Sequence, residues 1–480
     1  MSTEITIIQQ NDTHGYLEPH PELFWHHSKP VFKTAGGFAR IAGYVQSIRQ
    51  QKQNVLFVDG GDLFHGTGPL VMSKGEIIVP LLSKMKIDAY VPGNWDFAYG
   101  PKQLSTLMGG LPAPSISANV MDLTSQKTFF QPYVIKEIHG IRVGLIGLTY
   151  PYVSDTMPPS FSDGLSFDLG VDRLPAIIEK LRGEEHVDLV MVASHMGLPL
   201  EVKLATIVNG LDVILSGHSH DRITRPIIQN GCIIIQSGAS GSFLGRLDIK
   251  VEMGNITDFK HQLVFLSSEE YPEDPEVAHM VMEMLKPYRR QLDPVIGQLS
   301  TPLHRMTLNE SPMDQLITDA YLHYTKADIA FSHGWRYGAP ILPGPVTVKE
   351  LYQIIPANPE LFTLELDGQA VLKILESNLE QVYASDPFEQ KGGYVLRSSN
   401  INMAYKPYNP KGHRIQHIEI KGEQLQLDKL YRVVAAGHQM LKPYTAKHKP
   451  LGVHSHDVLS EYFSATNDVR VEGRPRIITI

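Results

Sequence analysis

The sequence predicts an α/β (α+β) protein that is built from two domains. Its 480 residues exceed what one hydrophobic core usually supports, so a second domain is expected. Short apolar, β-branched runs recur through the first half, and stretches with helical periodicity lie between some of them. Short buried strands that alternate with helices are typical of a sheet covered by helices.

Composition argues against several classes of protein. Hydrophobic residues make up 42% of the chain and charged residues 20%, as in ordinary globular proteins. The net charge of −8 and the lack of a long basic run argue against a groove for nucleic acid. No run of about eighteen apolar residues occurs, so we expect no membrane-spanning segment.

The amino-terminal segment and the cysteine content favour a cytoplasmic protein. The start, "MSTEITIIQQNDTHG", lacks the basic region, the apolar core and the cleavage site of a signal peptide, so none is expected. The single cysteine, Cys232, excludes a disulfide within the chain. The 21 histidines are compatible with metal chemistry, although scattered surface histidines are the simpler explanation.

Residues 1–266 are predicted to form the first domain, with helices over 36–52, 75–86 and 171–182. Two predicted strands, "IRVGLIGLTYP" and "CIIIQSGASG", end without polar side chains that could bind a ligand. Five others end in a polar turn: "EITIIQQNDTHG", "NVLFVDGGDLFHG", "DAYVPGNWDF", "VDLVMVASHMG" and "LDVILSGHSHD". Ligands of such sheets collect beyond the carboxyl ends of the strands, which is where these turns lie.

Residues 267–294 are predicted to be a linker helix. The acidic segment "SSEEYPEDPEV" opens the helix and marks a change in composition. Its apolar residues follow helical spacing, which favours core packing over a cofactor site. They are Val277, Met280, Val281, Met284 and Leu285.

Residues 295–480 are predicted to form a second, smaller α/β domain. Helices are expected near 312–325 and 368–382. The segment "ADIAFSHGWRYG" lies between these helices, and strands are expected in "RIQHIEIKG" and "YRVVAAG".

Polar side chains at the five strand ends form a candidate ligand set for two divalent ions. Oxygen ligands mixed with imidazole suit manganese, iron or zinc better than calcium. The glycines of "DGGD" let the backbone turn beneath a bridging carboxylate. Each motif alone is also typical of a capped turn or a histidine-bearing loop, but five in order favour a metal site. The set is Asp12, His14, Asp62, Asn94, His195, His218 and His220, with Asp62 as the bridge.

The motifs "NDTHG", "GDLFHGT", "GNWDF", "SHMG" and "GHSHD" resemble, in the same order, the ligand blocks of the calcineurin-like metallophosphoesterases. The resemblance is specifically to the two-domain 5′-nucleotidase family, and it covers nearly the whole chain. It implies a metallophosphoesterase β-sandwich flanked by helices, followed by a substrate-binding C-terminal domain of the 5′-nucleotidase type.

The resemblance also implies how the ions are held, with manganese as the expected metal. A water or hydroxide that bridges the two ions would be the nucleophile. The first ion would be bound by Asp12, His14, Asp62 and His220, and the second by Asp62, Asn94, His195 and His218.

Two positions depart from the nucleotidase pattern. Nucleotidases follow the ligand asparagine with a histidine and orient it with an aspartate, but here Trp95 and Ala98 stand at those positions. Such an acid contributes roughly 10²–10⁴ in rate, and its loss matters least when the leaving atom is a good anion. The aromatic clamp for the base is also incomplete, because only Tyr394 of "QKGGYVLR" is placed to form half of it.

Both differences from the nucleotidases, the missing acid pair and the incomplete clamp, resemble the thiosulfohydrolases of bacterial sulfur oxidation, the SoxB-type branch. Those enzymes carry a tryptophan after the metal ligand and blocks similar to "GWRYGAPILPG" and "EQKGGYVLR". They cleave a sulfonate from a cysteine persulfide on a carrier protein, so the leaving group is a sulfur anion. They are exported, however, whereas this amino terminus predicts no signal peptide.

Several other residues have two interpretations. Arg336 of "SHGWRYG" matches the family arginine that meets the substrate anion, and a surface salt bridge is the alternative. Arg397 is a further candidate for substrate binding. His65 is either a replacement proton donor or a hydrogen bonder behind a ligand, and Trp95 is either a wall of the site or a packed indole. The candidate catalytic residues are His195, Arg336 and His65, and the candidate substrate-binding residues are Arg336, Tyr394, Arg397 and Trp95.

Three functions stay open on the sequence. The first is a two-metal hydrolase of a phosphate ester or anhydride, with a small anionic, nucleotide-like substrate. The second is cleavage of a sulfur–sulfonate bond, with a carrier protein as the partner. The third is a metal-binding pseudoenzyme that binds an anionic ligand or partner, and the complete ligand set argues against it.

Overall fold

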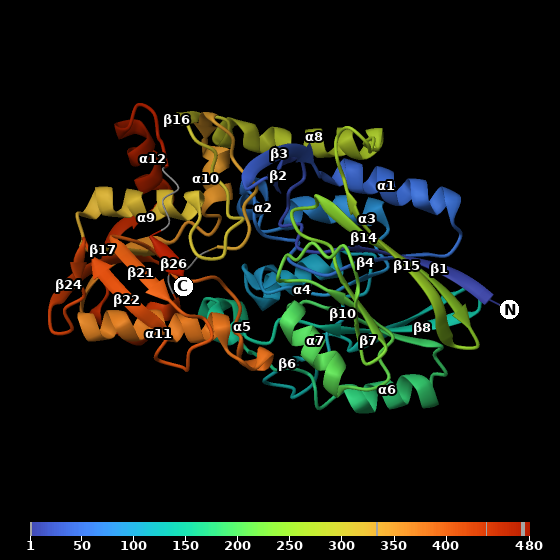
Figure 1. The fold of residues 1–480 in the computed structure, drawn as a ribbon. Coiled ribbons are helices and arrows are strands. Elements are labelled where there is room, and N and C mark those ends of the chain that lie inside the picture. Colours follow the sequence, from blue (N-terminus) through green and yellow to red (C-terminus); the bar gives the residue numbers. More distant parts are fainter. Residues whose placement is uncertain (1, 333–334, 438, 472–475) are drawn as a thin grey trace. The chain divides into compact units, whose positions relative to one another are not determined.

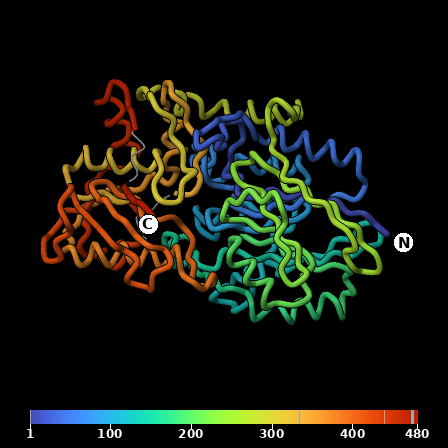
Figure 2. The backbone as a smooth tube through the Cα atoms, viewed as in Figure 1, coloured from blue at the N-terminus to red at the C-terminus, as the bar shows by residue number. Residues whose placement is uncertain are grey.

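Strands and helices alternate through both halves of the chain, which confirms the α/β class (Figure 1). The structure is a computed structural model that describes residues 2–332, 335–437, 439–471 and 476–480. The chain folds into two compact units. The first unit comprises Met1–Glu22 and Lys33–Pro287, and the second comprises Leu23–Phe32 and Tyr288–Ile480. Figure 2 traces the path of the backbone by residue number.

Two sheets form the centre of the first unit. One has the strand order β15 (Asn255–Phe265), β14 (Phe243–Glu252), β1 (Ser2–Gln10), β4 (Val55–Asp59) and β5 (Ala89–Tyr90). The other has the order β12 (Ile227–Gln229), β13 (Cys232–Gln236), β11 (Val213–Ser216), β10 (Leu189–Ser194), β8 (Ile141–Leu148) and β7 (Tyr133–Ile138).

Parallel pairing brings the functional strand ends to the same edge of each sheet. Strands β1, β4 and β5 are parallel neighbours in the first sheet. Strands β8, β10, β11 and β13 are parallel neighbours in the second. All six residues of β10, "LVMVAS", are buried, as expected for a strand covered on both faces.

The two sheets share one core, and helices cover the first sheet from outside. Ile5 and Ile7 of β1 pack in the same cluster as Leu145 and Met191 of the second sheet. Ile8 points the other way, because successive side chains of a strand alternate in direction. It packs in a cluster with residues of α1 (Phe38–Gln51), α3 (Val79–Met85) and α4 (Pro101–Gly109).

Further helices and two small strand pairs occur in this half of the chain. The helices are α2 (Gly68–Met72), α5 (Val153–Thr156), α6 (Leu174–Gly183) and α7 (Leu198–Ile207). One small sheet joins β2 (His20–His26) to β3 (Lys29–Ala35), and a small antiparallel pair joins β6 (Val120–Asp122) to β9 (Leu165–Phe167).

Helix α8 (Pro275–Leu292) lies within the predicted linker, and the division between the units falls inside it. Val277, Val281 and Leu285 are buried in the core of the first unit, and Met280 and Met284 pack against it. The methionine stripe therefore serves packing, as its spacing predicts. No helix in the described ranges is long and apolar enough to cross a membrane.

The second unit is a smaller α/β arrangement around its own core. Its largest sheet has the order β20 (Arg397–Ser399), β17 (Ile329–Ser332), β24 (Leu430–Ala436), β19 (Glu360–Asp367) and β25 (Lys449–His454). A second sheet has the order β23 (Glu423–Gln424), β22 (Ile415–Ile420), β21 (Ile401–Tyr405) and β26 (Ile477–Thr479), and a third pairs β16 (Val295–Leu299) with β18 (Gly344–Thr347). The helices are α9 (Pro312–Thr325), α10 (Val348–Ile354), α11 (Gly368–Tyr383) and α12 (Ser455–Ala465).

A buried ion network ties the start of α9 to this unit. Asp314 is fully buried and lies 3.4 Å from Nε of Arg305 and 3.2 Å from Nε of Arg397. Ser311, the N-cap of α9, donates its hydroxyl to Asp314 Oδ2 at 2.6 Å. Because two buried guanidinium groups share one carboxylate, Asp314 is the residue on which the network depends.

Replacement of Asp314 by Ala is expected to lower the free energy of unfolding by about 3–5 kcal/mol, because two buried cations lose their partner. Denaturant unfolding measures this change in the free energy of unfolding. The control is Glu283→Ala, which breaks the exposed pair with Lys286 and should change stability little. Equal unfolding midpoints for the two variants would contradict the prediction.

Candidate metal centre

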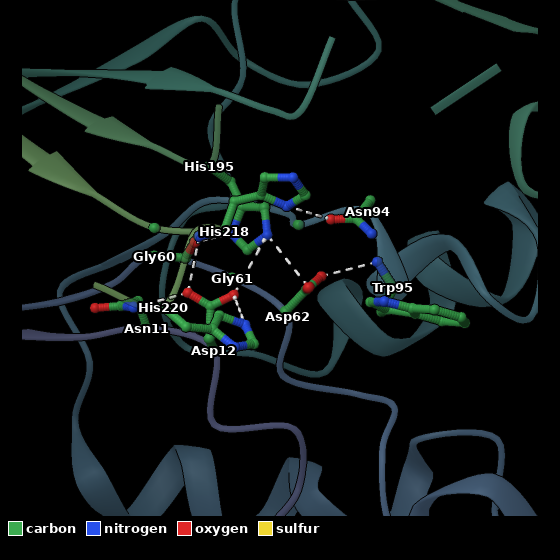
Figure 3. A network of polar contacts seen from close by, with 12 residues as sticks. Asn11, Asp12, Gly60, Gly61, Asp62, Asn94, Trp95, His195, His218 and His220 are labelled. Carbon is green, nitrogen blue, oxygen red and sulfur yellow. Dashed lines mark hydrogen bonds and ion pairs between the residues drawn. The ribbon is translucent and has the colours of Figure 1, made fainter. Parts of the chain in front are cut away.

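The predicted ligands come together at the carboxyl ends of five strands. Asp12 and His14 follow β1, Asp62 follows β4 and Asn94 follows β5, while His195 follows β10 and His218 and His220 follow β11. Figure 3 shows the carboxylates of Asp12 and Asp62 with imidazoles gathered around them. Two groups have donor atoms that lie within 4.8 Å of one another: Asp12, His14 and His220, and Asp62, His195 and His218.

Short distances connect the two groups. Nε2 of His195 lies 3.3 Å from Asp62 Oδ2 and 3.6 Å from Asp12 Oδ1. Nε2 of His220 lies 3.1 Å from Asp12 Oδ1 and 3.3 Å from Nε2 of His14. The two groups are therefore parts of one buried cluster.

Asn94 joins the cluster through its side-chain amide. Its Oδ1 lies 2.9 Å from Nδ1 of His218 (Figure 3). Its Nδ2 points to the sulfur of Met157 at 3.6 Å. The amide oxygen therefore faces the same side as the other donor atoms.

Five of the seven ligand candidates have a backbone in the left-handed region. Their φ angles are 52° for Asp12, 47° for His14, 55° for Asp62, 70° for His218 and 61° for His220. Few non-glycine residues adopt this conformation, and it is typical of functional sites that the surrounding fold holds under strain. The strand-end loops are thus shaped to present these side chains.

Two glycines allow the Asp62 and Asn94 loops to touch. Gly61 has φ of 91°, and a Cβ there would clash with the carbonyl oxygen of Val91. A Cβ at Gly93 would clash with the Asp62 side chain. Glycine is required at both positions because the backbones approach too closely for any side chain.

The carboxylates of the cluster stay ionised in spite of their burial. Burial opposes the charge on Asp12, but the imidazoles of His220 and His195 outweigh it and lower the pKa of this carboxyl. The pKa of Asp62 is also lowered, because His195 outweighs its burial. Burial also disfavours a charged His195, yet Asp62 and Asp12 raise the pKa of this imidazole to about 10. By contrast, burial lowers the pKa of His14 to about 4.

The residues present fit a pair of divalent ions. The set offers two carboxylates, one amide oxygen and four imidazoles, a mixture that suits transition metals. Nε2 of His195 is buried without a hydrogen-bond partner in the described ranges. Its Nδ1 lies 2.5 Å from the carbonyl oxygen of Gly60, an arrangement that orients metal-binding histidines.

Asp96 organises the cluster, although sequence reasoning did not single it out. Its carboxylate accepts hydrogen bonds from the backbone N–H groups of Asp62, Leu63, Phe64 and Gly93, at 2.7–2.9 Å. Burial and the neighbouring Asp62 raise the pKa of Asp96 to about 6. One buried carboxylate thus fixes the loops of two ligands. The only signal in the sequence was an acid in the otherwise apolar turn "WDFAY".

Asn11 is a second residue that the sequence analysis missed. Its side chain donates to Asp12 Oδ2 at 2.7 Å and to the carbonyl oxygen of Gly238 at 2.8 Å. Its Oδ1 accepts the N–H of Ser237 at 3.1 Å. Asn11 therefore orients the Asp12 carboxylate from behind.

Trp95 stands in an aromatic wall beside Asn94. Its indole stacks on the buried imidazole of His65, with ring centres 4.8 Å apart and an angle of 14°, and meets Phe161 edge to face. Its backbone N–H donates to Asp62 Oδ1 at 2.8 Å (Figure 3). Burial lowers the pKa of His65 to about 3. Ala98 packs against the core and offers no polar group.

The predicted substrate residues of the second unit lie in different surroundings. Arg336 is half-buried, while the guanidinium of Arg397 is fully buried in the network around Asp314. Arg397 also donates to the carbonyl oxygens of Leu308 and Thr307. Its guanidinium carbon lies 4.9 Å from the ring centre of Tyr394. These contacts favour a supporting role for Arg397, behind Tyr394.

Comparisons with known proteins match both halves of the chain. Residues 5–222 match the family model described as calcineurin-like phosphoesterase, and residues 295–442 match the 5′-nucleotidase C-terminal domain. The trifunctional nucleotide phosphoesterase protein YfkN of Bacillus subtilis is 24% identical over 98% of this chain, which spans only 35% of that protein. The 5′-nucleotidase of Vibrio cholerae is 24% identical over 89% of this chain and 83% of its own length.

Two solved structures are similar to this chain over nearly its whole length. A sulfate thiohydrolase SoxB from Thermus thermophilus has a TM-score of 0.92 at 26% identity, covering 99% of this chain and 96% of that one. A 5′-nucleotidase precursor from Thermus thermophilus has a TM-score of 0.88 at 25% identity, covering 100% of this chain and 99% of that one. The match over residues 5–222 assigns this part of the chain to the calcineurin-like metallophosphoesterases, which are hydrolases of phosphoester bonds. With its matching second domain, the chain belongs to the two-domain 5′-nucleotidase family, as the motifs predicted.

Asp62→Asn is expected to reduce the bound metal from about two ions to one or fewer per chain, because the amide is a poor bridging ligand. Elemental analysis after manganese reconstitution measures the stoichiometry. Asp258→Asn, at an exposed position of β15, is the control and should bind as the parent does. Two retained ions in the Asp62 variant would exclude Asp62 as the bridge.

Asp96→Asn is expected to lower the free energy of unfolding by about 2 kcal/mol or more, because the amide nitrogen cannot accept the buried N–H groups. We also expect manganese affinity to fall about tenfold or more as the ligand loops loosen. Asp122→Asn is the matched control, since Asp122 accepts backbone N–H groups in an exposed turn. Denaturant unfolding measures the stability, and calorimetric titration measures the manganese affinity. If both equal those of the parent, the role given to Asp96 is refuted.

Proposed function

We propose that this chain is a two-metal hydrolase that attacks phosphate esters or anhydrides of nucleotide-like substrates. The position of the Asp62 carboxylate is the observation that supports the proposal. Its Oδ2 lies 3.8 Å from Nε2 of His14 and 3.3 Å from Nε2 of His195, so it faces both ligand groups. Its Oδ1 is held by the N–H of Trp95. A bridging ligand needs this placement between two sets of donors.

The remaining ligand roles follow from the two groups. Asp12, His14 and His220 would complete the first site, and Asn94, His195 and His218 the second, with manganese as the first candidate metal. Bound divalent ions would supply an activated water and neutralise charge on the phosphoryl oxygens.

Groups of the second unit are proposed to contact the substrate. The fork-shaped guanidinium of Arg336 suits the oxygens of a phosphate or sulfonate. Tyr394 offers a ring against which an aromatic part of the substrate could stack. We give Arg397 the task of supporting Tyr394 rather than a direct contact, on account of its burial.

The aromatic wall supports a preference for good leaving groups. Trp95 and Ala98 occupy the positions at which nucleotidases are expected to carry the acid and its partner, and neither can donate a proton to a leaving oxygen. His65 is the nearest replacement, but its ring is stacked on Trp95 and buried. Protonation of a departing alkoxide is therefore the step for which this chain is least equipped.

Hydrolysis of a sulfur–sulfonate bond is the second candidate function. The specific observation in its favour is Trp95 beside the ligand Asn94, together with the likeness to the structure of a sulfate thiohydrolase. A sulfur anion leaves without protonation, so the lost acid would carry no cost. A carrier protein would then be the partner. A pseudoenzyme is the less favoured alternative because the whole ligand set is retained, and the cytoplasmic location stays a prediction.

The rate is expected to depend steeply on leaving-group basicity: fast with nitrophenyl phosphate, an anhydride or an S-sulfonated thiol, and slow with AMP. Each unit of leaving-group pKa left unprotonated raises the barrier by up to about 1.4 kcal/mol. Steady-state kinetics of the manganese-loaded protein on this panel measure the dependence, and the S-sulfonated thiol separates the two candidate functions.

Two variants test whether the missing proton donor causes this dependence on the leaving group. The double variant Trp95→His, Ala98→Asp restores an acid pair. It should reduce the difference between the hydrolysis rates of nitrophenyl phosphate and AMP. Trp95→Phe, which keeps an aromatic ring without an acid, is the matched control and should leave this difference as it is. Equal rates of the parent on both substrates would show that another group, His65 first among them, donates the proton.

A further inference from the structure

The imidazole of His218 is enclosed on three sides by Tyr150, His195 and Gly197. The ring of Tyr150 stacks on its face, with centres 4.1 Å apart and an angle of 28°. The ring of His195 meets it edge to face at 5.2 Å and 63°. At its Cδ2 edge lies Gly197, where even a Cβ would stand only 3.3 Å away.

Tyr150 reaches His218 from a strand two places away in the sheet. It follows β8, whereas His218 follows β11, and β10 with His195 lies between them. Tyr150 is 2% exposed and belongs to the core of the first unit. Its ring therefore packs beyond the end of β10, among the ligand loops.

The loop that carries Tyr150 is fixed by the side chain of Asn119. Asn119 donates to the carbonyl oxygens of Thr149 and Asp168, each at 2.7 Å. Its Oδ1 accepts the N–H of Thr149 at 2.8 Å and the hydroxyl of Ser117 at 2.9 Å. Because both the oxygen and the nitrogen of the Asn119 amide are engaged, and three residues are tied together through it, the loop has little freedom to move.

The orientation of the His218 ring decides whether it can serve as a ligand. Its Nδ1 lies 2.9 Å from Asn94 Oδ1, and its backbone N–H donates to Asp12 Oδ2 at 2.8 Å. These contacts fix the backbone and one edge of the ring (Figure 3). The torsion about the Cβ–Cγ bond of histidine is intrinsically broad, however, so the ring plane needs a further restraint. The face of Tyr150 supplies one.

We propose that Tyr150 is a positioning residue that holds the His218 imidazole in the plane that presents Nδ1 to the ion shared with Asn94. The proposal rests on the proposed ligand role of His218. It differs from ordinary core packing in one respect: the ring, and not merely an apolar side chain of similar bulk, is required. The hydroxyl group of Tyr150 is not needed for this task.

Metal binding to the protein without substrate tests the proposal. Tyr150→Phe keeps the ring, and Tyr150→Leu replaces it by a branched aliphatic side chain. Calorimetric titration with Mn²⁺ gives the affinity of each site, and the visible absorption of Co²⁺-loaded protein reports the ligand geometry. We expect the Leu variant to lose about tenfold or more in affinity at one site, with an altered Co²⁺ spectrum. The Phe variant should stay within about twofold of the parent.

Two further variants serve as references. Tyr44→Leu removes another buried tyrosine of the same core, which meets Tyr271 edge to face, so it should lower stability but leave metal affinity and the Co²⁺ spectrum unchanged. His218→Ala should abolish binding at one site. If it retains both ions, the ligand assignment fails and this proposal with it, whatever the substrate preference turns out to be.

Other outcomes bear on Tyr150 alone. Parent-like affinity and spectrum in Tyr150→Leu would overturn the proposal, as would an equal loss in Tyr150→Phe, which would assign the effect to the hydroxyl. If the Leu variant does not fold, Tyr150→Met, which fills the volume with a flexible chain, takes its place with the same expected loss. A loss of metal affinity in Tyr44→Leu equal to that in Tyr150→Leu would reduce the effect to general destabilisation.

Discussion

The metal centre depends on the contact between two strand-end loops, the one that carries Asp62 and the one that carries Asn94. Four backbone N–H groups from these loops converge on the Asp96 carboxylate, which is fully buried. The approach is so close that Gly61 and Gly93 admit no side chain. A buried carboxylate with several N–H partners is a strong and directional restraint. It holds the strained backbone of the ligand residues in place before any ion binds.

This arrangement explains how the chain can lose an acid and keep a metal site. At position 95 the main chain holds the Asp62 carboxylate, while the side chain forms part of the aromatic wall and stacks on His65. The two tasks are independent, because the N–H group is present whatever the side chain is. Trp95 can therefore alter the chemistry at the leaving group without disturbing the bridging ligand. Because the N–H group of Trp95 holds Asp62, the indole of Trp95 can stack on the buried ring of His65.

The second unit shows that a residue of a motif can have neighbours that the motif does not indicate. Arg397 follows "QKGGYVL" and looks like a substrate contact from its place in that block. The fold instead buries its guanidinium beside Asp314, where two arginines share one carboxylate. A buried cation is stable only with such a partner. Its influence on a substrate would pass through Tyr394, whose ring lies over it.

The sequence by itself determined the α/β class, the two domains and the seven ligand candidates. These rest on features that lie along the chain: strands that alternate with helices, the chain length with a change in composition, and apolar strands followed by polar turns. Only the tertiary structure decided which side chains support those ligands. Asn11 directly precedes the ligand Asp12 and Asp96 lies two residues after Asn94, yet their partners are up to 227 residues away. Tyr150 reaches His218 across an intervening strand. Hydrogen bonds and ring contacts between distant strand ends leave no periodic trace in a sequence, because they depend on which strands the sheets bring together.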